Sequence, residues 1–166
     1  MCQCEYPDLG IKRISGVQFC AGERWCRGVT AMNKLIEWKD EYNLGVGGLD
    51  HEHVEWVDRA NRVISALEAG SPPSAVNDAF FDLLDITVKH FDLEESHMEL
   101  AYYPDLARHR SLHDRHIRDL VRFQGRCHRG EVSGEGAATF LLDWLLEHIL
   151  QADADYAPHF QSRSKA

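Results

Sequence analysis

Histidine and carboxylate side chains recur at helical spacing along this sequence. His90 and Glu94 are four residues apart, as are His109 and His113. Residues four apart lie about 40° apart around a helix, so both members of each pair can reach one point. Imidazole nitrogen together with carboxylate oxygen suits iron, manganese or zinc. We therefore interpret these pairs as candidates for a metal site with nitrogen and oxygen ligands.

The same side chains fall on helix faces that should be apolar. A helix that packs into a core buries positions in alternating steps of three and four residues. A buried imidazole or carboxylate is costly in a dry core unless it is paired or bound. One such histidine is more often a hydrogen-bonded core residue, but convergence from four segments favours a shared metal site. The polar residues on these faces are His53, His90, Glu94, His97, His109, His113, His116 and His148, with Asp153 beside the last face.

Four helices would position these side chains. Each periodic segment ends where helix geometry fails, at a glycine followed by prolines, before a proline, or in a turn-rich stretch. Short connections between amphipathic helices predict an all-α fold, an antiparallel up-down four-helix bundle. The helices are predicted at residues 50–69, 74–102 with Ser74 as N-cap, 105–128 with Asp105 as N-cap, and 136–156, which stops short of Pro158.

The composition excludes several classes of protein. The chain has 166 residues, 44% of them hydrophobic, without an apolar run that could span a bilayer, so no membrane role is expected. A net charge of −9 disfavours binding to nucleic acid. The first residues do not resemble an export signal, which predicts a cytoplasmic protein.

The chain divides into two regions of different character. Residues 37–160 are predicted to form the bundle, and residues 1–36 an irregular arm that is weakly periodic. Five cysteines are an odd number, so unpaired thiols in a reducing compartment are the favoured interpretation, ahead of a metal site or a redox switch. The cysteines of the arm are Cys2, Cys4, Cys20 and Cys26.

Four motifs resemble those of the hemerythrin family, in particular its single-domain bacterial form. They follow the family's order and span about residues 37–156. The resemblance implies a non-haem di-iron protein that binds O2 reversibly as a carrier, store or buffer. Its cofactor would be two Fe ions with a bridging oxo or hydroxo group. The motifs are EWKDEYNLGVGGLDHEH ending at His53, HFDLEESHM from His90, YPDLARHRSLH from Tyr103, and WLLEHILQAD from Trp144.

The resemblance also implies a ligand set with one vacancy. Five imidazoles, two bridging carboxylates and a bridging oxygen leave a single open position on two octahedral ions. An open position is where a small molecule binds. The implied ligands are Glu94 and Asp153 as bridges, His53 and His90 on the ion with the open position, and His109, His113 and His148 on the other.

The last two ligands have an unusual spacing. His148 and Asp153 are five residues apart, which is about 140° around an ideal helix, so one of them would point away from the site. We therefore predict a π-type bulge or wide turn near residues 150–152.

Apolar residues near the site are candidates for a dry O2 pocket, or for ordinary core packing. Such a pocket keeps water and external protons away from the bound gas. The candidates are Trp56, Trp144, Leu145 and Ile149.

His97 and His116 depart from the family, which usually has apolar or aromatic residues at these positions. Three interpretations stay open: hydrogen bonds to a carbonyl or carboxylate in the next layer, donors to bound O2, or a different metal site. For the last, Glu94 and His97 have the Glu-x-x-His spacing of ferritin-like proteins, and zinc could use His109 and His113.

A second function shares the same site. An O2 or redox sensor, or a di-iron enzyme that reduces O2, peroxide or nitric oxide, would use the same residues. The two extra histidines favour reactivity, whereas the lack of a fused signalling domain favours a free-standing binder. The expected small-molecule partner is O2, and the sequence does not identify a protein partner.

Overall fold

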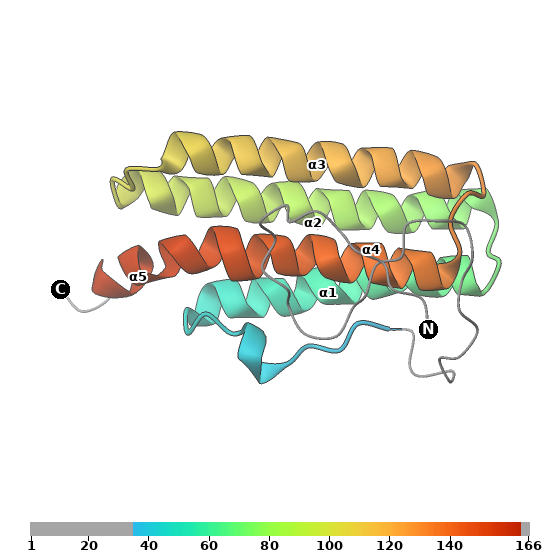
Figure 1. The fold of residues 1–166 in the computed structure, drawn as a ribbon, viewed down its shortest axis with the longest axis horizontal. Coiled ribbons are helices and arrows are strands. Elements are labelled where there is room, and N and C mark those ends of the chain that lie inside the picture. The colour runs from blue at the N-terminus through green and yellow to red at the C-terminus, as the bar shows by residue number, and fades with distance from the viewer. Residues whose placement is uncertain (1–34, 164–166) are drawn as a thin grey trace, which may run out of the picture. The chain divides into compact units, whose positions relative to one another are not determined.

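The structure, a computed structural model, describes residues 35–163, which form an antiparallel four-helix bundle (Figure 1). The predicted fold class is confirmed. Of the predicted arm, residues 1–34 lie outside the described residues, and with them the four arm cysteines. No helix within residues 35–163 is both long and apolar enough to cross a membrane. The helices are α1 Gly47–Glu68, α2 Pro73–Leu100, α3 Leu106–His128, α4 Gly134–Glu147, a π-helix His148–Asp153, and α5 Ala154–Arg163, with a short 3-10 helix at Asp40–Tyr42 before them.

Glycines and prolines set most helix ends as expected. Gly70 follows α1 with a φ of 60°, a left-handed conformation that glycine adopts without strain. The prediction of Ser74 as the cap of α2 was wrong, because Pro72 is the N-cap and Pro73 occupies the first turn. Proline suits that turn, since its missing N–H would have no helical partner there.

Pro158 does not end the last helix, which corrects a second prediction. It lies inside α5, which continues to Arg163. The ring removes one helical hydrogen bond, but Tyr156 and Ala157 on the same turn are buried. Tertiary packing of this turn outweighs the local preference of proline.

The interior of the bundle has two halves of different chemistry. The half beside the α1–α2 and α3–α4 turns, called the apolar half below, is filled by aliphatic and aromatic side chains. The other half, the polar half, holds imidazoles and carboxylates. Central residues of the apolar half are Ile64, Phe80, Leu83, Leu120, Phe123 and Leu141; those of the polar half are His53, His90, Glu94, His109, His113, His148 and Asp153.

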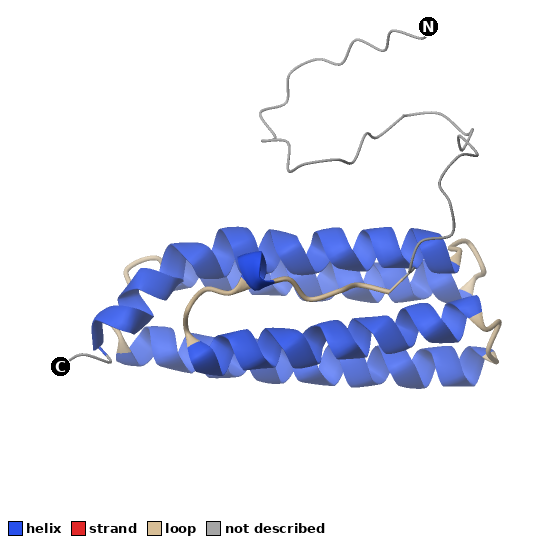
Figure 2. Cartoon of the chain, turned by 90° about the horizontal axis from the view of Figure 1, so that it is seen from below, coloured by secondary structure: helices blue, strands red, loops and turns tan. Residues whose placement is uncertain are grey.

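The segment before α1 runs along the bundle (Figure 2). Asn61 of α1 fixes its start, because the side chain accepts from the N–H of Ile36 at 2.7 Å and donates to its carbonyl at 2.8 Å. Closer to the helix, Asp50 accepts from the N–H of Leu44 at 2.7 Å. The segment thereby places Trp38 against His53, with ring centroids 6.1 Å apart.

Candidate metal centre

A π-helix joins the last two predicted ligands, His148 and Asp153. The segment His148–Asp153 is π-helical, and both end residues are fully buried. The wider turn lets residues five apart share a face. His148 Nε2 accordingly lies 2.9 Å from Asp153 Oδ1, and the predicted bulge is confirmed.

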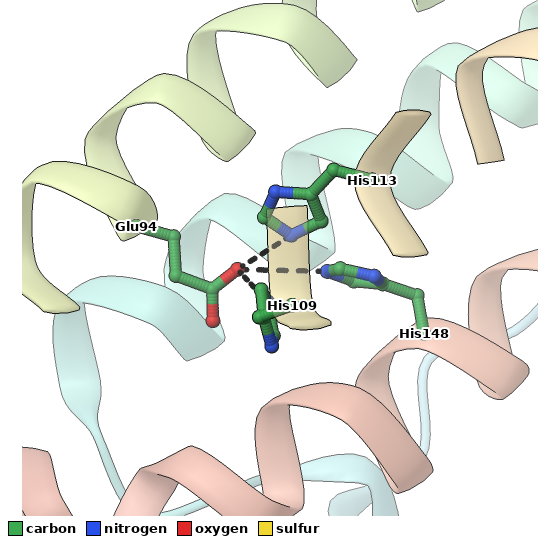
Figure 3. Close-up of side chains that lie close together, drawn as sticks. All are labelled: Glu94, His109, His113 and His148. Carbon is green, nitrogen blue, oxygen red and sulfur yellow. Dashed lines mark hydrogen bonds and ion pairs between the residues drawn. The ribbon is translucent and has the colours of Figure 1, made fainter. Parts of the chain in front are cut away.

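Glu94 is the meeting point of three histidines (Figure 3). Its Oε2 lies 3.2 Å from Nε2 of His109 and 3.2 Å from Nε2 of His113. Nε2 of His148 approaches the same oxygen to 3.7 Å from the opposite side of the bundle. These four buried side chains could together hold one metal ion.

The two remaining histidines, His53 and His90, lie close to the carboxylate of Asp153. Its Oδ2 lies 3.0 Å from Nε2 of His53 and 4.0 Å from Nε2 of His90. A second group that could hold an ion consists of His90, Glu94, His148 and Asp153. The two groups share Glu94 and His148, so two ions held here would be neighbours. The structure therefore brings all seven predicted ligands to one place.

The inner atoms of this cluster are buried and poorly satisfied by the protein itself. Several ring nitrogens and carboxylate oxygens have no hydrogen-bond partner among the residues that the structure describes, although such atoms are costly to leave unpaired. Imidazole lone pairs and carboxylate oxygens that face one point fit a metal cation. These atoms are Nε2 of His53, His90, His113 and His148, Oε1 of Glu94, and both carboxylate oxygens of Asp153.

The carboxylates stay ionised in spite of burial. Burial raises the pKa of Glu94, but the neighbouring imidazoles of His109 and His113 lower it by more, to well below its usual value. The pKa of Asp153 is likewise lowered from its ordinary value: burial raises it, and the charge of His148 outweighs that effect. Burial lowers the pKa of His148, but Asp153 brings it to about 9. Two buried anions at the centre give the site its attraction for cations.

Two carboxylates outside the predicted ligand set contact Nδ1 of a ligand histidine, on the side of the ring that faces away from the centre. Nδ1 of His90 lies 2.8 Å from Glu52 Oε2, and Nδ1 of His113 lies 2.7 Å from Glu95 Oε1. A ring that donates Nδ1–H to a carboxylate keeps the Nε2 lone pair for a metal. Sequence reasoning missed both glutamates because each lies beside the ligand-bearing face rather than on it; their positions next to His53 and Glu94 were the available clue.

An aromatic wall covers the centre on the side of α1 and α4. Trp56 lies with its ring centroid 5.1 Å from that of His90 and 5.3 Å from that of His148. Its indole N–H donates to Thr87 Oγ1 at 2.7 Å, so the ring is fixed. Phe91, which was not predicted, stacks on His113 at 3.8 Å. The four predicted lining residues, Trp56, Trp144, Leu145 and Ile149, are all buried.

A groove borders the centre between α3 and the π-helix that continues α4. This groove of about 590 Å³ is lined by residues of α3, the π-helix and their surroundings, and both His109 and His116 border it. Its rim is charged: Arg115 and Glu147 form an ion pair at 3.2 Å. A smaller hollow of about 290 Å³, lined from α1 and α2, borders none of the seven predicted ligands.

The two extra histidines occupy different environments. His97 is half-buried on α2 and belongs to neither group that could hold an ion. His116 is buried on α3, where its Nδ1 lies 3.2 Å from the carbonyl oxygen of Leu112. Burial lowers the pKa of His116 to about 4, so the ring is neutral near pH 7.

Comparisons with known proteins agree with this geometry. The family described as Hemerythrin HHE cation binding domain matches residues 44–160. A Bacteriohemerythrin of Stenotrophomonas maltophilia is 31% identical over 123 residues, covering 74% of this chain and 80% of that protein. A Bacteriohemerythrin of Methylococcus capsulatus is 30% identical over 126 residues, covering 75% and 95%. A crystal structure of wild-type hemerythrin superposes with a TM-score of 0.64 at 30% identity, covering 75% of this chain and 96% of that one.

Proposed function

This chain belongs to the hemerythrin family of non-haem iron-binding domains, and from that premise we propose that it holds two iron ions and binds O2 reversibly. It would act as a carrier, store or buffer in the cytoplasm. The observation that carries the proposal is the convergence of five imidazoles and two ionised carboxylates, with unsatisfied inner atoms, at one buried point. The proposed metal ligands are His53, His90, Glu94, His109, His113, His148 and Asp153.

The protein residues would hold the ions and fix the donor geometry. Bound ferrous iron would supply the electrons and the vacant position that O2 needs. Glu94 and Asp153 each lie close to histidines of different helices, so each carboxylate could contribute ligands to both ions. Glu52 and Glu95 accept the outer protons of His90 and His113 and so keep these rings in orientation.

The aromatic wall suits the storage of a gas without further reaction. His53 lies beside Trp38 and His90 beside Trp56, so the histidines proposed for the open ion are packed against apolar rings. Exclusion of water from this side would suppress proton delivery to the gas and its release in reduced form. Reversible binding depends on this exclusion.

A sensor or di-iron enzyme is the alternative, and the groove favours it. Its charged rim brings polar surface as far as His109, one of the proposed ligands. Water or protons that reached the centre by this path would favour irreversible reduction of O2, with ferrous iron as the electron source, over reversible binding. Such a protein would consume O2, peroxide or nitric oxide, or would report O2 through oxidation.

Optical spectra of the iron-loaded, reduced protein separate these functions. The protein would be cycled between argon and air, with iron per chain measured beforehand. Two irons per chain and a spectrum that appears and disappears over repeated cycles are expected. His128→Ala, an exposed site on the same helix as His109, is the matched control and should behave like the parent protein. One irreversible change on the first exposure to air would support the alternative, and a chain without iron would refute the di-iron proposal.

A further inference from the structure

The proposed ligand histidines differ in whether Nδ1, the ring nitrogen that faces away from the metal centre, has a hydrogen-bond partner. His90 and His113 each direct Nδ1 to a carboxylate, Glu52 and Glu95 respectively. His148 also turns Nε2 towards the carboxylates, 2.9 Å from Asp153. Its Nδ1, however, is buried without a hydrogen-bond partner among the described residues. A fully buried N–H in this state costs free energy unless an acceptor lies within reach.

The neighbouring His116 has a buried ring nitrogen that can accept a hydrogen bond. Its Nδ1–H donates to the carbonyl of Leu112, because a carbonyl can only accept. The neutral ring therefore has its lone pair on Nε2. That atom is buried and likewise has no hydrogen-bond partner among the described residues. An unsatisfied acceptor thus belongs to the ring next to an unsatisfied donor.

The two rings are close enough to join. The centroids of His116 and His148 are 5.3 Å apart, with an angle of 65° between the ring planes. Each nitrogen lies roughly 1.2 Å from its ring centre, so nitrogens that face each other would be about 3 Å apart, an ordinary hydrogen-bond length. The steep angle between the planes allows a nitrogen at the edge of one ring to face a nitrogen of the other.

Three other rings lie as close to His148, and none presents a free acceptor. The His113 ring is 5.1 Å away, but its Nε2 faces Glu94 and its Nδ1 faces Glu95. Trp56 and Phe91 are 5.3 Å and 4.8 Å away by ring centroids and present apolar ring atoms. Trp144 donates its indole N–H to the backbone carbonyl of His116 at 3.1 Å. This bond ties the α4 side of the centre to the turn of α3 that carries His116, so the two rings keep their relative position.

We propose that His116 is a positioning residue that accepts the Nδ1–H of His148 on its Nε2. The resulting chain of hydrogen bonds runs from the Leu112 carbonyl through His116 to His148 and on to the metal. It takes the place that Glu52 and Glu95 have behind His90 and His113. Because imidazole is a neutral acceptor, it polarises the His148 ring less than a carboxylate would. The proposal rests on the proposed metal-binding function.

Two substitutions distinguish the role of His116 as a hydrogen-bond acceptor from a role in packing alone. His116→Leu fills the space without an acceptor, whereas His116→Gln keeps an oxygen that can accept from His148. With Co²⁺ as the probe and a competing chelator, His116→Leu is expected to bind metal about 10- to 100-fold more weakly. His116→Gln should recover most of the affinity. Leu120→Ala, a buried core position one turn along α3, is the control for lost stability and should leave affinity within about threefold.

Nuclear magnetic resonance of the zinc-loaded, ¹⁵N-histidine-labelled protein provides a second readout. The Nδ1–H of His148 should give a slowly exchanging signal in the parent protein and in His116→Gln, and exchange rapidly in His116→Leu. Affinity and exchange that are unchanged in His116→Leu would overturn the proposal, as would a His116→Gln variant as weak as His116→Leu. A parent protein that binds neither Co²⁺ nor Zn²⁺ would instead overturn the proposed function itself.

Discussion

The apolar and polar halves of this bundle are built on the same four helices but are stabilised in different ways. In the apolar half, side chains such as Leu83 and Phe80 are buried among hydrocarbon, and removal from water favours the folded state directly. In the polar half, Glu94 and Asp153 are buried as anions, and their burial opposes folding until it is compensated. A functional site therefore makes one half of the fold dependent on a ligand, while the other half supplies stability without one.

Metal removal should have the largest effect and should act on the polar half. Chelation is expected to lower the melting temperature by about 10 °C or more, since a ligand present at a thousandfold excess over its Kd contributes about 4 kcal/mol. Calorimetry of loaded and chelated protein measures this difference. Equal melting temperatures would mean that the seven buried side chains compensate one another without an ion.

A cavity in the apolar half should destabilise the protein without affecting the metal. Leu83 is fully buried, so Leu83→Ala is expected to cost about 2–5 kcal/mol in the free energy of unfolding. Chemical denaturation would measure the cost, and metal analysis of the folded variant should give the same iron content as the parent protein. A lower iron content would show that the halves are coupled more closely than this comparison assumes.

A smaller effect is expected at the boundary between the halves. Thr87→Val leaves the indole N–H of Trp56 buried and unpaired, because Thr87 Oγ1 accepts that N–H at 2.7 Å. The loss should be about 1–3 kcal/mol, measured by denaturation. Trp56 is the wall of the proposed O2 site, so autoxidation of the iron-loaded variant should also become faster. Thr87→Ser keeps the hydroxyl and serves as the control; if it behaved like Thr87→Val, the hydrogen bond would not be the cause.

Chemical labelling should show the smallest change. Burial raises the pKa of Cys127, at the end of the apolar half, to about 11, so about one thiol in a thousand is ionised at pH 8. Alkylation of Cys127, followed by peptide mass spectrometry, should be slow in folded protein and fast in denaturant. The slow rate should persist in chelated protein; rapid labelling there would show that metal loss opens both halves.

The sequence predicted what periodicity and residue chemistry control. The spacing of His90 with Glu94 and of His109 with His113 located the polar half, and the five-residue step from His148 required the π-helix. The role of Pro158 was missed because burial of its neighbours, a tertiary effect, decides whether the helix continues.

Contacts between residues of different helices could not be predicted from the sequence. Glu52 and His90 are far apart in the chain and meet only because α1 and α2 are antiparallel. The groove beside His109 depends on how α3 and the π-helix pack against each other, which local spacing does not encode.

The π-helix also sets the phase of everything that follows it. A π-turn holds about one residue more than an α-turn, so it rotates the downstream face by about 100° relative to an uninterrupted helix. Tyr156 is thereby buried, and its ring packs against Tyr103 beside the α2–α3 turn at 5.1 Å. Shortening this segment by one residue would turn Tyr156 outward as well as removing Asp153 from the centre. The extra residue that aligns a ligand is thus also the one that fastens the end of the chain to the bundle.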